Sequence, residues 1–540
     1  MRWIGALAAV VVAAVLSLWL LRNATSLVHA NPRAGNTSSD QLGKVDFPTS
    51  CSANVQPTIE KGVALLHSFQ YQQAKQIFTE AATQETACAM ANWGAAMSLY
   101  HQLWDFPSDE TIAEGRRYIE QAQKAAELSP RERAYVAAAA AFYQDDSKLA
   151  HADRWRAYLA AMEKLHQDFP NDTEGAEFDA LSLISNPASS ADDSASRKKA
   201  IAILDPLFRA APNNPGAAHY LIHATDTPEL APQGLDAARA YARIAPDSSH
   251  ALHMPSHIFV RLGLWQETID SNLAASASAA RATEMHLSDP HYQIHALDFL
   301  DYAYIQTGQE TKAHQIVEDL QAIPGMADMK NMADEVAYFV ARNALELHHW
   351  KEAAAIPVPD VKLAWQDTTY RARAIGAARI GDVDGARKAT AKLAEAVVAR
   401  EAEQKQKGYY IPEGESIDQR EAEGWLAYAE GKPDEAIQRM RSAADRQEKN
   451  GLDSIGIPAR EMLADLFVEL KRPADATAEY MIVLKNSPNR FDALYGAARA
   501  AQLAGNAQDA QWYFAKLVEI SAVTADRPEL REAHVFIAQK

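Results

Sequence analysis

The sequence predicts an all-α fold built from repeated helix pairs, and three observations support this prediction. Alanine, the strongest helix former, is abundant and runs unbroken through Ala137–Ala141. Long segments with alternating polar and apolar residues, which would indicate strands, are missing. Paired histidines recur at a fixed spacing, since His219 and His223 are followed 34 residues later by His253 and His257. A period of this length is typical of a helical solenoid, in which each pair packs on its neighbours.

The N-terminal residues are predicted to be a targeting segment. Nineteen residues from Trp3 to Leu21 carry no charge and follow Arg2, and this length can span a bilayer. We therefore expect residues 1–30 to be a signal peptide, cleaved after Ala30, or a single retained membrane anchor. Either form implies export to the periplasm or another extracytoplasmic space. Residues 31–50 are rich in Gly, Ser and Asn and are predicted to form a flexible tether.

The charge balance and the cysteine count restrict the partners and the compartment. The formal net charge is -18 at pH 7, and an acidic surface repels phosphate backbones, so no nucleic-acid partner is expected. The chain has two cysteines, Cys51 and Cys88. An even number in an exported protein favours a disulfide between them, whereas two reduced, packed thiols are the alternative.

The repeat pattern is clearest near the C-terminus. Ala476 and Tyr480 are followed 34 residues later by Ala510 and Phe514, with Gly505 at the turn between helices. Related spacings of small, large and turn residues occur around Gly431, Gly381, Gly308, Gly263, Ala200 and Ala74. After the tether, the chain therefore resembles the tetratricopeptide repeat family over almost all of its length. The strings Cys88–Gly94 and His253–His257 (HMPSH) more narrowly resemble those of exported bacterial tetratricopeptide proteins of unassigned activity.

The resemblance implies a superhelical solenoid of antiparallel helix pairs, whose first helices line a concave groove. We expect tetratricopeptide-like repeats in residues 51–210, a central histidine-rich group in 211–325, and C-terminal repeats in 326–540. In register with the family, the paired histidines fall on groove positions of three successive units. Pro255 interrupts the middle unit, so its helix is expected to start late or to be kinked.

Imidazole pairs four residues apart on a helix are a common arrangement for binding a transition metal such as zinc, copper, nickel or iron. The candidate ligands, including two carboxylates that could instead orient a ligand, are His219, His223, Asp226, His250, His253, His257, His291, His295 and Asp298. The other histidines, including His67, His101, His348 and His349, are expected at the surface or in turns.

Three other functions compete with metal binding. The groove could bind a partner protein or a peptide, with Arg261 supplying charge and Tyr302 supplying stacking. The histidines could instead be structural and satisfy one another inside the solenoid. An enzyme is less favoured, because the sequence has no HExxH string, phosphate loop, nucleophile elbow or dinucleotide fingerprint.

Overall fold

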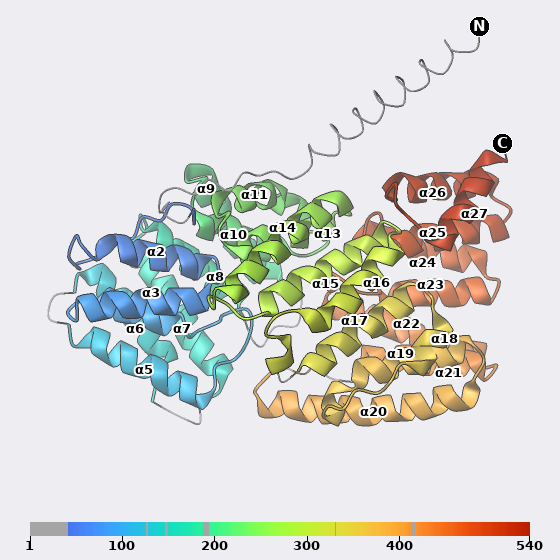
Figure 1. Cartoon of the computed structure of the whole chain (residues 1–540), viewed down its shortest axis with the longest axis horizontal. Helices are drawn as coiled ribbons and strands as arrows, with labels where there is room; N and C mark the ends of the chain where they lie inside the picture. The colour runs from blue at the N-terminus through green and yellow to red at the C-terminus, as the bar shows by residue number, and fades with distance from the viewer. Residues whose placement is uncertain are drawn as a thin grey trace, which may run out of the picture. The chain divides into compact units, whose positions relative to one another are not determined.

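The computed structural model describes residues 41–125, 128–145, 149–186, 194–329, 331–409, 411, 414 and 416–539. Every regular element within these ranges is helical, which confirms the predicted all-α class (Figure 1). No helix among the described residues is long and apolar enough to cross a membrane. The predicted targeting segment, residues 1–30, lies outside the described residues.

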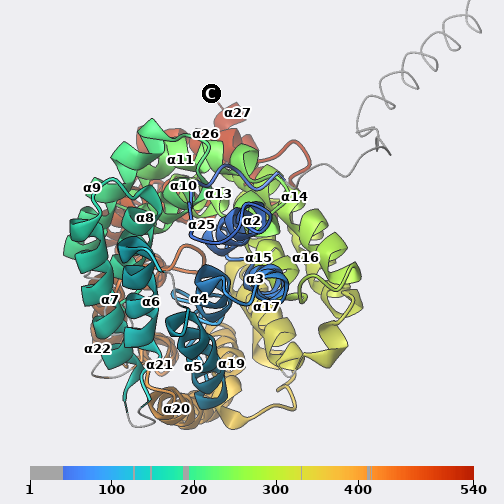
Figure 2. The ribbon, with the colours of Figure 1, turned by 90° about the vertical axis from the view of Figure 1, so that its left-hand side faces the viewer.

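The N-terminal repeats begin with helices that pack on one another in chain order (Figure 2). The capping box of Ser129 and Glu132 illustrates how local sequence sets a boundary, because each side chain binds the other's backbone N–H where a helix starts. The helices are α2 (Gln56–His67), α3 (Tyr71–Gln84), α4 (Ala89–Met97), α5 (Asp109–Gln123), α6 (Pro130–Phe142), α7 (His151–Asp168), α8 (Thr173–Ile184) and α9 (Ser194–Ala210).

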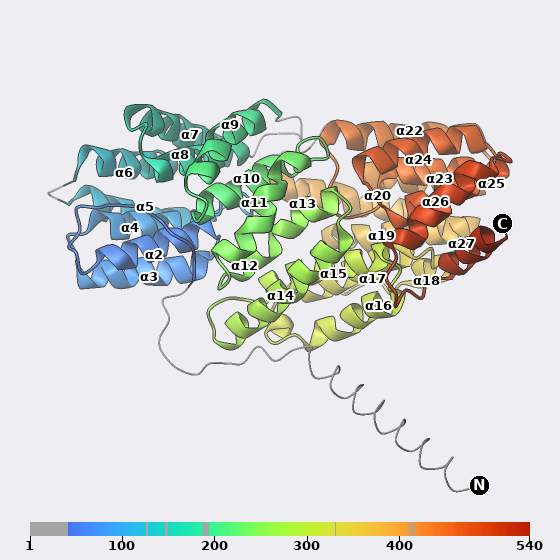
Figure 3. The same ribbon diagram turned by 90° about the horizontal axis from the view of Figure 1, so that it is seen from above.

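The central helices follow, and in Figure 3 they lie between the N-terminal and C-terminal repeats. They are α10 (Pro215–Thr225), α11 (Ala231–Ile244), α12 (Ser249–His253), α13 (Pro255–Arg261), α14 (Trp265–Glu284), α15 (His291–Gln306) and α16 (Glu310–Asp319), followed by the short 3₁₀ turns η1 (Leu320–Ala322) and η2 (Met326–Asp328).

The last two C-terminal repeats keep the predicted period, since α24 begins at Pro473 and α26 begins 34 residues later at Ala507. Their elements are α17 (Met332–Glu346), α18 (Trp350–Ala355), η3 (Leu363–Trp365), α19 (Asp367–Arg379), α20 (Val383–Gln406), α21 (Ile417–Ala429), α22 (Pro433–Asn450), α23 (Ala459–Glu469), α24 (Pro473–Asn486), α25 (Phe491–Leu503), α26 (Ala507–Ile520) and α27 (Pro528–Ala538).

A large residue of one helix fits over a glycine of the next at several points, as the repeat pattern requires. A Cβ atom on Gly94 would lie 2.3 Å from the Phe78 ring, and one on Gly496 would lie 2.2 Å from the Tyr480 ring. Real Cβ atoms do not approach so closely, so these helices touch only because the facing residue is glycine.

The end of the predicted tether is packed, which differs from the expectation for residues 31–50. Leu42 and Phe47 are buried, and Phe47 stacks on Trp93 with ring centroids 5.3 Å apart. The Lys44 N–H donates to the Asn213 carbonyl at 2.8 Å. Apolar residues within an otherwise polar stretch therefore attach residues 42–50 to the helices. The rest of the predicted tether, residues 31–40, lies outside the described range.

The predicted disulfide between Cys51 and Cys88 is confirmed. It joins the segment before α2 to the residue that caps the start of α4.

The C-terminal repeats contact the central ones. The Trp265 indole N–H donates to the Asn489 carbonyl at 2.7 Å, and the Ala522 N–H donates to the Thr307 carbonyl at 2.9 Å. These contacts bring the segment between α22 and α23, residues 451–458, against the histidine-bearing helices. We call these eight residues the covering segment.

Candidate metal centre

Helices α10, α12, α13 and α15 bring six of the predicted histidines together in two groups of three. The first trio is His219, His223 and His250, and the second trio is His253, His257 and His295. Within each trio, one ring nitrogen of each residue lies within 4.8 Å of the others. Side chains from three successive repeats thus lie close together, although residues 34 apart, such as His219 and His253, fall in different trios.

Pro255 determines how the middle repeat presents its histidines. Helix α12 ends at His253 and α13 begins at Pro255, with Met254 between them, because proline has no backbone N–H to continue the helix. The helix is therefore broken rather than late, and His253 lies on α12 instead of on a loop. Across this break, the Nε2 atoms of His253 and His257 lie 3.1 Å apart.

The hydrogen bonds of the second trio assign its tautomers. His253 Nδ1 lies 2.7 Å from Asn272 Oδ1, and the amide nitrogen of Asn272 donates to the Thr268 carbonyl. The Asn272 oxygen must therefore accept, so His253 Nδ1 carries the proton. His257 Nδ1 likewise donates to Asp226 Oδ2 at 2.9 Å. In neutral imidazoles both Nε2 atoms then have no proton, and their lone pairs face each other.

Two facing lone pairs repel unless a cation lies between them. That cation is either a proton, which would make one ring an imidazolium, or a metal ion bound by both nitrogens. The second trio therefore has the donor chemistry of a metal site. The Nδ1 atoms of His253 and His257 are held by oxygen acceptors, and their Nε2 atoms are available to a metal ion.

The first trio is more deeply buried and is built in a similar way. His219 Nδ1 donates to the His67 carbonyl at 2.5 Å, which leaves His219 Nε2 unprotonated, and this atom lies 3.1 Å from His250 Nε2. His223 Nε2 is buried without a hydrogen-bond partner. The Phe69 ring packs over the trio, with its centroid 4.4 Å from that of His219.

Burial keeps most of these imidazoles neutral. It lowers the pKa of His219 and of His295 to about 3, and it lowers the pKa values of His223, His250 and His253 well below the ordinary range. The neutral ring is the form that binds a metal ion, so protons do not compete for these nitrogens near pH 7.

Asp226 lies outside both trios and orients His257. Burial by itself would raise the pKa of Asp226, but Arg261 and His257 outweigh burial and hold that pKa well below its usual value. Arg261 Nε donates to Asp226 Oδ1 at 2.8 Å. This carboxylate is therefore ionised and acts as a hydrogen-bond acceptor for a candidate ligand.

The covering segment contacts the two residues that were expected to line an open groove. Arg261 donates to the Asp453 carbonyl at 2.9 Å, and the Tyr302 hydroxyl donates to the Gly456 carbonyl at 3.3 Å. Ser454 Oγ also donates to Asp226 at 3.0 Å. The chain itself therefore occupies the position proposed for a peptide next to Arg261 and Tyr302.

Besides Asp226, two other predicted ligands, Asp298 and His291, do not join the trios. Asp298 forms an ion pair with Arg342, which also binds Asp301, so its carboxylate faces that guanidinium instead of the histidines. His291 begins α15 and is exposed, with its ring parallel to that of His295 and the centroids 6.3 Å apart. Repeat register placed Asp298 on the groove side of its helix and His291 just ahead of that helix, but it could not show which partner each would meet.

Sequence reasoning missed two supporting residues. His67, which was expected at the surface, is fully buried, with Nε2 2.5 Å from Glu174 Oε2 and Nδ1 2.9 Å from the Tyr220 hydroxyl. Its carbonyl accepts the proton of His219. Asn272 is a single residue in the middle of α14, and no pattern in the sequence distinguishes it from other polar helix residues.

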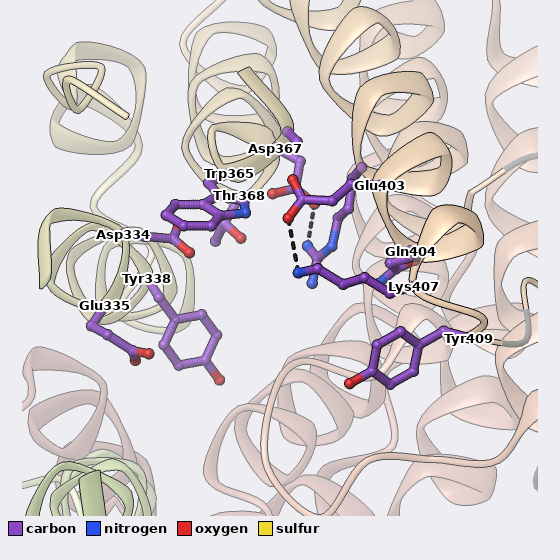
Figure 4. A pocket seen from close by; sticks show the side chains of 12 residues that line it. Asp334, Glu335, Tyr338, Trp365, Asp367, Thr368, Glu403, Gln404, Lys407 and Tyr409 are labelled. Atoms are coloured by element: carbon purple, nitrogen blue, oxygen red, sulfur yellow. Dashed lines mark hydrogen bonds and ion pairs between the residues drawn. The ribbon is translucent and has the colours of Figure 1, made fainter. Parts of the chain in front are cut away.

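Other polar groupings lie outside the trios. Glu310, His314 and His349 form a partly exposed group near the starts of α16 and α18. A cavity of about 810 Å³ is lined by Asp226, Arg261 and part of the covering segment. A hollow of about 400 Å³ between α17, α19 and α20 is lined by Asp334, Glu335 and several aromatic rings (Figure 4). We call it the acidic hollow.

Comparisons with known proteins identify no family. No family description and no curated protein matches the chain, so the narrower resemblance to exported bacterial proteins is not supported. Similar solved structures include a human IFIT1 dimer with m7Gppp-AAAA, at 14% identity and TM-score 0.35, covering 84% of this chain and 94% of that one. Another is a monomeric IFIT1 mutant with Gppp-AAAA, at 14% identity and TM-score 0.35, covering 87% and 100% of the two chains. Similarity this low supports no conclusion about ligands.

Proposed function

We propose that this chain is a metal-binding helical-repeat protein, whose histidine trios hold transition-metal ions through Nε2 atoms. The observation that carries the proposal is the pair His253 and His257, whose Nε2 atoms lie 3.1 Å apart while both Nδ1 atoms are hydrogen-bonded to oxygen acceptors. Nitrogens bound to one tetrahedral zinc ion at ordinary bond lengths are separated by about 3.3 Å. A metal ion therefore fits this arrangement with little movement of either ring.

The donor set favours zinc, copper, nickel or iron. Each trio offers imidazole nitrogens alone, and imidazole suits all four metals. Both cysteines are joined in a disulfide, so no thiolate is available to either trio. Three protein ligands also leave one position of a tetrahedral ion open for water or another small ligand.

Peptide binding in the same groove is less well supported. A peptide that contacted Arg261 and Tyr302 would have to displace the covering segment and its hydrogen bonds to both residues. Binding of a metal ion requires no such displacement.

We also propose that the protein acts outside the cytoplasm. The Cys51–Cys88 disulfide supports this location, because disulfides persist in oxidising compartments and are rare in the cytosol. Export is further supported by the uncharged N-terminal stretch of the sequence.

Elemental analysis of the purified, untagged full chain after dialysis tests the proposal. We expect at least one stoichiometric transition-metal ion per chain, and we expect the double variant H253A/H257A to lose the ion of the second trio while keeping its helical circular dichroism. The matched control is H314A/H349A, which removes two partly exposed histidines and should keep the metal content unchanged.

The competing structural interpretation predicts a different result. If a proton lies between His253 and His257, the wild-type chain will contain no metal and will not bind added zinc or copper at micromolar concentration. That result would overturn the proposal, as would unchanged metal content in H253A/H257A.

A further inference from the structure

We infer that the two trios form one dinuclear centre, in which two metal ions lie close enough to share a bridging oxygen ligand. This inference rests on the proposed metal binding but goes beyond it, since two separate mononuclear sites would satisfy that proposal equally well.

Ring separations show that the trios adjoin each other. His223 and His257 belong to different trios, yet their ring centroids lie 6.2 Å apart, and those of His250 and His253 are also separated by 6.2 Å. Within the first trio, the centroids of His223 and His250 are 6.4 Å apart. The shortest separations between the trios are therefore similar to the longest separation inside the first trio.

The order of the ligands along the chain explains this proximity. His250 and His253 lie on the same short helix, α12, and they belong to different trios. His219 and His223 on α10 contribute to one trio, and His295 on α15 contributes to the other. The break at Pro255 turns α13 so that His257 faces His253 while still lying beside His223.

Charge balance favours an anionic bridge. Two divalent ions on six neutral imidazoles would place several positive charges in a buried site, which is costly without compensation. Among the described residues, Asp226 is the carboxylate hydrogen-bonded to a histidine of these trios, and Arg261 already neutralises it. A hydroxide between the ions would supply negative charge where the protein supplies none.

Aromatic rings limit access of bulk water to this centre. The Phe299 centroid lies 4.8 Å from that of His253 and 4.6 Å from that of His257, and Phe69 covers the first trio. Such surroundings exclude competing water molecules and stabilise a ligand that bridges the two metal ions.

Copper(II) titration followed by electron paramagnetic resonance tests the inference. The titration uses full-length protein carrying H314A/H349A, so that copper does not bind the partly exposed group. We expect two equivalents to bind, and we expect the signal per copper to fall by more than half as the second equivalent binds, because a bridged pair is magnetically coupled.

Single substitutions provide the matched variants. H223A removes a ligand of the first trio and H295A removes one of the second, and each should retain one copper with the full signal of an isolated ion. Both residues are less deeply buried than His219 or His253, and circular dichroism checks that each variant folds.

The outcomes separate the inference from the proposed function. Two bound coppers with full, uncoupled signals would overturn the dinuclear centre and leave metal binding intact. One bound copper in the parent protein would also overturn it. No bound copper would overturn the inference and, together with absent zinc, the proposed function.

Discussion

The histidine trios contain imidazoles alone, whereas the acidic hollow is lined by carboxylates and also by the cations Arg400 and Lys407, so the two regions accommodate burial differently. In the second trio, Asn272 and Asp226 accept hydrogen bonds from the Nδ1 atoms of His253 and His257. The Nε2 atoms of these two rings are therefore held in place as donors to a metal ion. In the hollow, Asp334 and Glu335 face open space, and the Asn331 side-chain amide donates a hydrogen bond to Glu335.

The pKa values record this difference. Burial and the nearby Asp367 raise the pKa of Asp334 to about 6, and burial and Asp334 raise the pKa of Glu335 to about 7. The hollow therefore takes up protons near neutral pH, whereas burial lowers the pKa values of His219, His223, His250, His253 and His295 and keeps these rings neutral. A group of donors becomes a metal site when neighbouring atoms fix which lone pairs point inward.

Removing the charged acceptor of His257 should have the largest effect on metal binding. In D226N the neutral amide accepts the His257 proton more weakly and leaves Arg261 without its ion pair. We expect metal affinity to fall about 10- to 100-fold, as for other residues that orient a ligand. Competition with a chelator of known affinity measures the change.

D298N is the matched control, because Asp298 pairs with Arg342, which keeps Asp301 as a second partner. Equal losses of metal affinity in D226N and D298N would show that the affinity depends on the overall negative charge of the protein and not on the hydrogen bond from His257 to Asp226.

Replacing the ring over the first trio should have an intermediate effect. Phe69 has a left-handed backbone with φ 53°, so glycine suits its conformation while removing the aromatic cover. We expect F69G to lower metal affinity several-fold and to speed release, because water reaches the first trio. Stopped-flow release to a chelator measures the rate.

K471G is the control, because Lys471 has the similar φ of 58° in an equivalent turn far along the chain. It relieves about 1 kcal/mol of backbone strain and should leave metal release unchanged. If both variants speed release alike, loosening of the repeats rather than loss of the ring is responsible.

The smallest expected effect is on the free energy of unfolding, and it concerns the acidic hollow. The raised pKa of Glu335 means that the folded chain keeps a proton that the unfolded chain has lost between about pH 4.5 and 7. The free energy of unfolding therefore falls as pH rises through this window and levels off above it. E335Q removes the contribution of Glu335 to this dependence and leaves that of Asp334, so it should be more stable than the parent at pH 8 and similar at pH 4.

Chemical denaturation at both pH values measures the difference, and metal content should stay constant throughout. If E335Q is less stable than the parent at pH 8, a nearby cation stabilises the ionised Glu335 carboxylate. The acidic hollow would then compensate its buried groups with specific partners, as the histidine trios do.

The 34-residue recurrence was enough to predict the helical class, the repeats and the convergence of His219, His223, His253 and His257, because a solenoid presents equivalent positions on one side. The pair of cysteines likewise predicted the disulfide. These features depend on local helix periodicity and on composition, and both can be read directly from the sequence.

The tertiary structure alone decided which atoms face one another. Two outer partners of the histidines, His67 and Asn272, come from α2 and α14, and the segment that covers Arg261 and Tyr302 lies about 150 to 190 residues farther along the chain. Spacing within one repeat contains no information about such distant contacts. The contacts of the covering segment arise because the C-terminal repeats pack on the central ones, whereas the trios themselves are supported by residues of α2 and α14.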